Sequence, residues 1–370
     1  MKTAIKIYCL VLLAMASGQV RASATDSLPE QHKEYSGHQL RTPFLNKLYQ
    51  WVKEFSSVDT NYIEPQRYNY TFMMQNTNTY EVYHLRNHKG QEVVFSPRPA
   101  YKVGPYFGWR WIFLGYTIDL TQFKNGDGRR DLNLSFYSSQ IGMDLFYRKS
   151  GNSYRVKRLT LGDDIDTSPM KNAQFEGFNS SVKGFNLYYI FNHRKFSYPA
   201  AYSQSTVQRR SCGSAIGGIG YTKHTLNVNW QEFEELVEKR MGGTLSSGIL
   251  DTTAIAGNVS YTDYSLSGGY AYNWVFAYNC LFDISLQTGL SYKRSTGNTN
   301  TSTSGFLKNF DFKNINVDGI LRVGLIWNNT RWFVGANSIF HTYNYSKSRF
   351  STNNIFGSVN FYVGYNFGKR

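Results

Sequence analysis

The sequence contains little that could cross a membrane as a helix. Its longest apolar run extends from Ile7 to about Ala16, and no later stretch holds 18 or more consecutive apolar residues. That run has roughly half of the ~20 residues that a transmembrane helix needs. A helical membrane anchor is therefore excluded.

The same run has the organisation of a secretory signal peptide. Lys2 and Lys6 precede it, and the small residues 22–24 (ASA) follow it. A basic region, a short apolar region and an Ala-x-Ala exit predict export and cleavage after Ala24, so 1–24 is assigned as a signal peptide. Cys9 has no small-residue cleavage site before it, which argues against a lipoprotein. Without a membrane helix, the exported chain is periplasmic, secreted or a membrane β-barrel.

Cysteine is scarce, and only Cys212 and Cys280 remain after cleavage. In the topology predicted below, they begin two strands that flank a third, which places them about 10 Å apart. A disulfide needs Cα atoms within ~7 Å of each other. The sequence therefore predicts two free thiols.

Acidic residues are also few, with 25 Asp and Glu against 40 Lys and Arg. Removing Lys2, Lys6 and Arg21 with the signal peptide leaves 37 basic residues and a net charge of about +12. The basic residues are scattered rather than clustered, which argues against nucleic acid as a partner. Contact with anionic outer-membrane lipid, such as the phosphates of lipopolysaccharide, fits this charge better, and solvated loops are the alternative.

Aromatic residues are abundant, at 17% of the chain with 29 Tyr and 26 Phe, yet the mean hydropathy is only −0.44. Membrane barrels have this composition because an apolar lipid face and a polar lumen face average to a neutral value. Tyr and Phe also fit the aromatic girdles at the two membrane interfaces.

From Tyr68 onward, apolar and polar residues alternate with the period of a half-buried strand. The last strand, 353–367, is the clearest, with apolar or aromatic residues at every second position from 359 to 367. A terminal amphipathic strand rich in aromatic residues is the expected signal for the outer-membrane assembly machinery. The natural assignment is the apolar face toward lipid and the polar face toward the lumen.

Turn signals divide 67–370 into about 12 strands, an even number that leaves both termini in the periplasm. Short turns such as 328–330 fall at one end, and long polar connections at 163–180, 224–257 and 295–312 fall at the other. This asymmetry is the one expected for short periplasmic turns and long external loops. The predicted fold is therefore all-β, a transmembrane antiparallel β-barrel in the outer membrane of a Gram-negative bacterium. The predicted strands are 67–86, 91–101, 110–122, 131–149, 153–162, 181–193, 210–223, 258–276, 279–294, 313–328, 331–345 and 353–367.

A leader, 25–66, precedes the barrel and contains a predicted amphipathic helix at 43–56. Thr42 and Pro43 are typical of a helix start. The apolar residues that follow lie on one helical stripe, which either packs against the end of the barrel or acts as a plug or docking surface. They are Phe44, Leu48, Trp51, Val52 and Phe55.

Two insertions interrupt the strand pattern. Asn229 with Glu232 forms a capping box at the start of a predicted external helix, and Gly242 and Gly243 end it. Its apolar face either covers the mouth of the barrel or packs on neighbouring loops. The second insertion, 194–209, is too long for a periplasmic hairpin, and we expect it to fold into the lumen.

Six segments spread along the chain have a recognisable pattern: Asp59 with 62–63 (YI), 104–109 (GPYFGW), 111–116 (WIFLGY), 144–148 (DLFYR), 196–202 (FSYPAAY) and 268–272 (GGYAY). With them the chain resembles a family of Bacteroidota outer-membrane proteins that is described as a domain of unknown function. The resemblance extends over nearly the whole mature chain and implies a barrel, but it supplies no catalytic residues.

Candidate chemistry is sparse. His84 and His88 share a strand face, but no third metal ligand is evident nearby, so no metal is predicted. Asn337 and His341 share another face without a serine beside them, which favours a hydrogen-bonded pair in the lumen over catalysis. No phosphate loop or nucleophile elbow is present, and no cofactor is expected.

The charged residues predicted to face the lumen are the remaining candidates. Asp144 and Arg148 lie four residues apart on one strand, about 13 Å, as do Asp318 and Arg322, so we expect each to pair across strands. They form either an internal ion-pair network or a conduit that selects solutes. The set is Asp119, Asp144, Arg148, Asp283, Lys293, Asp318 and Arg322.

Three hypotheses of function remain open. The first is a structural or partner-binding barrel, and the second is a narrow or gated channel for small solutes. The third is a lipid- or lipopolysaccharide-modifying enzyme that uses His341 or His193.

Overall fold

The alternation of apolar and polar residues produces one large antiparallel sheet, because successive side chains of a strand point to opposite faces. The computed structural model describes residues 57–109, 112–115, 118–119, 129–151, 153–162, 164–242, 257–295, 315–347 and 350–369. The predicted all-β, antiparallel fold is confirmed. The predicted signal peptide and the predicted helix at 43–56 lie outside the described residues.

Strands make up most of the described chain, and short helices interrupt them. The elements are β1 (Ile63–Pro65), β2 (Tyr68–Asn87), β3 (Glu92–Pro97), β4 (Ala100–Trp109), β5 (Ile112–Gly115), β6 (Ile118–Asp119), β7 (Arg130–Tyr137), β8 (Ile141–Lys149), β9 (Tyr154–Thr160), the 3-10 helix η1 (Ser168–Met170), β10 (Gln174–Phe175), β11 (Phe178–Ile190), α3 (Tyr198–Tyr202), β12 (Thr206–Gln208), β13 (Cys212–Val228), α4 (Trp230–Met241), β14 (Asn258–Ala277), β15 (Cys280–Ser295), β16 (Ile315–Asn328), β17 (Trp332–Lys347) and β18 (Phe350–Lys369).

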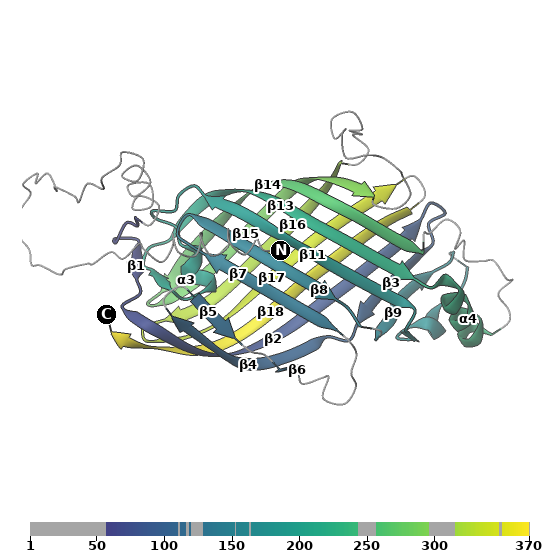
Figure 1. The fold of residues 1–370 in the computed structure, drawn as a ribbon, viewed down its shortest axis with the longest axis horizontal. Coiled ribbons are helices and arrows are strands. Elements are labelled where there is room, and N and C mark those ends of the chain that lie inside the picture. The colour runs from purple at the N-terminus through teal and green to yellow at the C-terminus, as the bar shows by residue number, and fades with distance from the viewer. Residues whose placement is uncertain are drawn as a thin grey trace, which may run out of the picture. The chain divides into compact units, whose positions relative to one another are not determined.

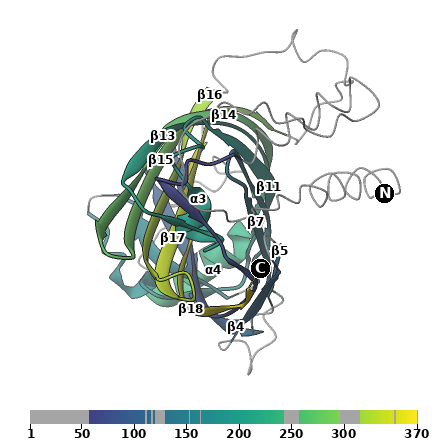
Figure 2. The same ribbon diagram turned by 90° about the vertical axis from the view of Figure 1, so that its left-hand side faces the viewer.

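The wall of the sheet follows the order β7-β8-β11-β13-β14-β15-β16-β17-β18-β2. At β2 the sheet branches, because 70–79 pair with β4 while 83–86 pair with β3, which continues to β9 and β10. The strand β4 pairs in turn with β5 and β6. Within the described ranges, no pairing joins β5 or β6 to β7, so the sheet curls around α3 without closing (Figure 2).

The predicted strands differ from the structure in three places. Residues 131–149 form the hairpin β7–β8, since Ser138 Oγ accepts the Ile141 N–H at 2.9 Å and stabilises a turn. Most of β4 falls between the predicted strands 91–101 and 110–122 and was not predicted. The predicted strand 153–162 is present as β9, but it pairs with β3 and β10 in the branch and does not stand in the wall. The branch lies at the end of the sheet where α4 is found, opposite the end that holds α3 (Figure 1).

The outer face of the wall is apolar. Leu266, Leu286 and Leu290 are 67%, 56% and 63% exposed, and the residues on either side of Leu286 and Leu290 in β15 are buried. In the last strand, Phe361 and Val363 are also exposed, as the alternation predicts. Side chains of this kind on an outer face require an apolar surrounding.

The inner face is buried, and at one end an aromatic cluster fills it. Phe95, Phe175, Phe178 and Phe233 are in ring contact, with centroid separations between 4.8 and 5.6 Å. The cluster joins the branch, η1 and α4 to inward aromatic residues of the wall such as Tyr83. We call it the cap cluster.

The helix α4 begins and packs as its sequence predicts. Asn229 caps it by accepting the Glu232 N–H, and the side chains of Trp230, Phe233 and Val237 are buried in the cap cluster. The helix therefore packs on the β3–β9–β10 branch. No helix in the described part of the chain is long and apolar enough to cross a membrane.

We expect Phe233→Ala to release α4 from the cap cluster. Truncating a fully buried Phe costs about 3–5 kcal/mol, so local opening and cleavage by trypsin after Lys239 or Arg240 should accelerate roughly a hundredfold or more. Glu235→Ala, at an exposed position of the same helix, is the control and should leave the cleavage rate nearly unchanged. Equal rates for the two variants would contradict this packing.

Candidate functional site

The charged residues predicted to face the lumen do lie on the inner face. Six of the seven have described side chains, and all six are 8% exposed or less. Asp119 lies in β6, and its side chain is outside the described set. The structure does not gather the six into one site, and it distributes them over separate polar clusters.

The first cluster surrounds Lys293 of β15. Its Nζ donates to Asp318 Oδ1 at 2.7 Å and lies 3.7 Å from Asp263 Oδ2. The ammonium also lies 5.8 Å from the ring centroids of Tyr261 and Tyr343. One fully buried cation is thus held by two carboxylates and two aromatic faces, an arrangement that fills space between the strands.

The second cluster joins opposite walls. Arg322 of β16 donates from Nη2 to Asp144 Oδ2 of β8 at 2.5 Å, and Ser135 Oγ donates to the other carboxylate oxygen at 2.7 Å. Because four strands separate β8 from β16 in the sheet order, this ion pair spans the interior. The guanidinium lies 4.8 Å from the ring of Tyr188, which occupies the space left by the missing side chain of Gly142.

The third cluster joins the two edges of the sheet. Lys102 of β4 donates to Asp131 Oδ2 of β7 at 3.0 Å. Arg148 Nε lies 3.4 Å from Asp131 Oδ1 and 3.4 Å from Glu81 Oε1 of β2. No backbone pairing joins β4, β5 or β6 to β7 in the described residues, so these ion pairs connect the two sides of a gap in the ladder. We call this set the seam cluster.

The prediction that 194–209 fold into the lumen is confirmed, and we call this range the plug segment. The hydroxyl of Tyr198 lies 2.5 Å from Ser285 Oγ, and Tyr202 donates to the Asp283 carboxylate. Burial and the adjacent Asp283 charge raise the pKa of Tyr202 well above its ordinary value, so the phenol remains protonated and donates.

Further hydrogen bonds attach the plug segment to other strands of the wall. Asn273 Nδ2 of β14 donates to the Ser197 carbonyl at 2.9 Å. Gln204 Nε2 donates to the Tyr362 hydroxyl of β18 at 2.9 Å, and Asn328 Nδ2 of β16 donates to Gln204 Oε1 at 3.2 Å. These hydrogen bonds therefore hold the plug segment in the interior.

The end of the leader is joined to the plug segment. The strands β1 and β12 form a short antiparallel ladder, in which Ile63 stands opposite Gln208. Arg209 also pairs with the Glu64 carboxylate and donates from Nη1 to Asn279 Oδ1 at 2.6 Å. Residues that precede the barrel in sequence thus contact the segment that fills it.

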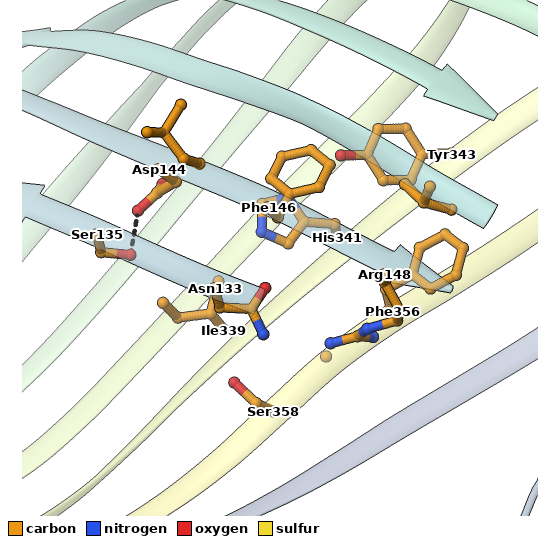
Figure 3. A pocket seen from close by; sticks show the side chains of 13 residues that line it. Asn133, Ser135, Asp144, Phe146, Arg148, Ile339, His341, Tyr343, Phe356 and Ser358 are labelled. Carbon is orange, nitrogen blue, oxygen red and sulfur yellow. Dashed lines mark hydrogen bonds between the residues drawn. The ribbon is translucent and has the colours of Figure 1, made fainter. Parts of the chain in front are cut away.

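One small cavity remains beside the charged clusters (Figure 3). Figure 3 shows Asp144 with Ser135 on one side and His341 and Arg148 on the other, around a volume of about 90 Å³. His341 Nδ1 and Arg148 Nη1 are buried and form no hydrogen bond within the described residues. Sites for small-molecule ligands occupy about 300–1,000 Å³, so this cavity has room for a few waters and not for such a ligand.

The histidine candidates do not form a catalytic or metal-binding arrangement. Asn337 Oδ1 accepts from Asn360 Nδ2 at 2.7 Å, and His341 lies between the rings of Phe146 and Tyr343. His84 Nδ1 lies 3.0 Å from Glu92 Oε1. The described residues contain no group of three or more His, Cys, Asp or Glu placed to hold a metal ion. Both described cysteines are free thiols, as predicted.

Three inward carboxylates, Asp263, Asp131 and Glu81, are not among the residues predicted to face the lumen. Asp263 lies two residues after the buried Tyr261 on the same strand, so both side chains face the same side. This spacing was the signal that could have identified Asp263 as inward-facing. Asp131 was assigned to a strand that is in fact a hairpin, so its face was not assigned. Glu81 stands alone in a strand whose neighbouring residues are mainly neutral, and its partner Arg148 is far away in sequence.

The curled antiparallel wall, its apolar outer face and its filled polar interior define a barrel-like membrane protein fold. The chain belongs to the family described as domain of unknown function DUF4421, whose model matches residues 57–367. The match confirms the resemblance to a family of unknown function, while the Bacteroidota origin stays a prediction. A comparison with curated proteins finds no match.

Solved structures of outer-membrane barrels are similar to the chain at low identity. The beta domain of the Bordetella autotransporter Brka has 13% identity and a TM-score of 0.33, with 80% of this chain and 99% of that chain covered. The outer membrane protease OmpT from Escherichia coli has 8% identity and a TM-score of 0.32, with 81% and 97% covered. The outer membrane protein OprG from Pseudomonas aeruginosa has 8% identity and a TM-score of 0.23, with 82% and 98% covered. Similarities at this level carry no argument about substrate or partner.

We expect Lys293→Met to destabilise the protein strongly. The change leaves Asp318 and Asp263 buried beside each other without their shared cation, which costs about 3–5 kcal/mol of unfolding free energy. Arg294→Met, one residue further on an exposed position, should change stability by only about 0.5 kcal/mol. Urea unfolding followed by tryptophan fluorescence measures both, and similar midpoints for the two variants would contradict the assigned cluster.

Proposed function

We propose that this chain is an outer-membrane β-barrel whose interior is closed by its own plug segment, and that it acts as a structural or partner-binding protein. The observation that carries the proposal is the plug segment itself. Its side chains and carbonyl groups are hydrogen-bonded to β14, β15, β16 and β18, so polar groups that would line an open pore are already occupied.

The apolar outer face supports a membrane location. A transmembrane strand needs about 9–11 residues, and the wall strands from β13 to β18 contain between 14 and 20 residues each. The predicted signal peptide supplies the export that this location requires. Outward Leu, Val and Phe side chains on such strands are the surface that lipid solvates.

Loop lengths support one orientation of the barrel. The end that holds the plug segment also has the short turns at 138–140 and 329–331, and Tyr68 pairs there with Lys369 near the C-terminus. The opposite end has the long connections 229–257 and 296–314. Membrane barrels usually have short periplasmic turns and long external loops, which supports a periplasmic position for the plug end.

The channel hypothesis requires the plug segment to leave the interior. A barrel of about 12 strands is intermediate between small barrels filled by side chains and wide porins, so its conductance depends on what occupies the lumen. In the described residues, the cap cluster fills one end, the ion pairs fill the middle and the plug segment fills the other end. The geometry therefore favours a closed barrel.

We expect Leu286→Arg to impair membrane insertion. Leu286 lies on the outer face near the middle of β15, where an arginine facing lipid costs about 2–4 kcal/mol. Thr225→Arg, on the outer face near the external end of β13, should cost about 0–1 kcal/mol. Folding into lipid vesicles, followed by protection from protease, measures the difference. Equal insertion of the two variants would argue against a lipid-facing wall.

Single-channel recording in a planar bilayer tests the closed interior. We expect the intact mature protein to show no conductance steps, and a variant in which 194–209 are replaced by a short Gly-Ser turn to conduct. Tyr278→Ala is the control, because Tyr278 is 86% exposed in a turn at the same end and should remain silent. Discrete steps in the intact protein would contradict the proposal and support the channel.

A further inference from the structure

On one part of the wall, the acidic side chains all face the interior, and the charged side chains that face outward are all basic. On the six neighbouring strands β7, β8, β11, β13, β14 and β15, every described carboxylate faces the interior. The charged side chains on the outer face of these strands are all basic, and we call them the basic belt. They are Arg130, Lys149, Lys183, Lys223 and Arg294.

Strand register brings the basic belt to one level of the wall. Lys183 stands directly opposite Lys223, and Arg130 stands directly opposite Lys149. Lys223 also stands opposite Thr262, which in turn stands opposite Arg294. The belt is therefore a continuous strip near the end of the wall that carries the long connections.

Like charges directly opposite each other on neighbouring strands destabilise a sheet. None of the five belt residues forms an ion pair with a carboxylate of the described residues. Where β2 meets the branch, Arg158 Nη2 and His84 Nδ1 lie 2.7 and 3.0 Å from the same Glu92 carboxylate oxygen. Among the described residues the belt therefore has no carboxylate partner, and an anion from outside the protein would supply one.

An aromatic row lies beside the belt, two residues closer to the middle of the wall. Phe185 stands opposite Tyr221, Tyr221 opposite Tyr264, and Tyr264 opposite Tyr292. The first two pairs are in ring contact, with centroids 6.1 and 5.5 Å apart. Such a row marks the boundary between hydrocarbon and head groups. Two residues of strand span about 7 Å, which places the belt at the depth of lipid head groups.

We infer that the basic belt binds the phosphate groups of lipopolysaccharide in the outer leaflet. This inference rests on the proposed membrane location and orientation, which assign the belt to the external side. Lysine ammonium groups attract phosphate as point charges, and the guanidinium of Arg130 or Arg294 can donate two hydrogen bonds to one phosphate.

The belt covers only part of the perimeter. At the same end of β17 and β18, the outer face carries neutral polar residues, with Asn344 opposite Asn353 and Ser346 opposite Ser351. Outward charge returns on β2, where Arg86 stands opposite the carboxylate residue Glu92 of β3. The binding surface is therefore a one-sided strip on β7 to β15.

A matched pair of triple variants tests the inference. The belt variant carries Lys183→Gln, Lys223→Gln and Arg294→Gln. The control carries Lys195→Gln, Arg210→Gln and Lys369→Gln, which remove the same charge from exposed side chains at the plug end. Each folded protein is titrated with purified lipopolysaccharide, with the same lipopolysaccharide after chemical dephosphorylation, and with phosphatidylglycerol, and the bound lipid is counted by native mass spectrometry.

We expect the intact protein and the control to bind phosphorylated lipopolysaccharide at least about tenfold more tightly than the dephosphorylated form, and the belt variant to lose this preference. High salt should weaken the phosphate-dependent part. Without lipid, the belt variant should unfold at an equal or higher temperature than the intact protein, because an opposed pair of like charges has been removed.

Other results would overturn the inference. Equal binding by the belt variant and the intact protein would remove the belt from the interaction. Equal affinity of the intact protein for phosphatidylglycerol would replace lipopolysaccharide by anionic lipid in general. A protein that inserts into vesicles without any phosphate preference contradicts this inference alone, whereas failure to insert contradicts the proposed function as well.

Discussion

The ion pair between Arg322 and Asp144 connects the two sides of the interior, and the other interior contacts are arranged around it. It joins strands that are far apart in the sheet order, so backbone pairing cannot substitute for it. A buried charge without its partner is costly. The two opposite walls must therefore stay close enough for these two side chains to remain in contact. Tyr188 and the small residue Gly142 complete the contact by giving the guanidinium a ring to lie against.

This constraint accounts for an interior that is filled with polar side chains in the described residues. Outward positions must be apolar for lipid, so inward positions carry the polar residues of each strand, and these must be satisfied without bulk water. The plug segment supplies many of the partners, through hydroxyl groups of Tyr198 and Tyr202 and the amide of Gln204. The described interior is thus held by hydrogen bonds between the plug segment and the wall.

The sequence predicts the sheet well because a period of two residues encodes directly which side chains face outward. It predicts that Asp318 and Arg322 need partners on other strands, since their spacing forbids direct pairing. It does not predict that their partners are Lys293 and Asp144. Those contacts depend on the strand register and on the curvature of the sheet, which the spacing within one strand does not contain. The hairpin β7–β8 was missed because its turn, 138–140, contains neither Gly nor Pro.

The seam cluster lies at a boundary between strands that differs from the other strand boundaries described in the wall. Elsewhere neighbouring strands are held by a ladder of backbone hydrogen bonds, which forms or breaks cooperatively over many residues. Between β4 and β7 the described contact is a side-chain one, from Lys102 to Asp131, and a single ion pair can separate and re-form without disturbing a ladder. In the described residues, contact across this line therefore depends on the charge of Asp131, so neutralising that one carboxylate would remove the ion pair to Lys102 while leaving every backbone ladder of the wall in place.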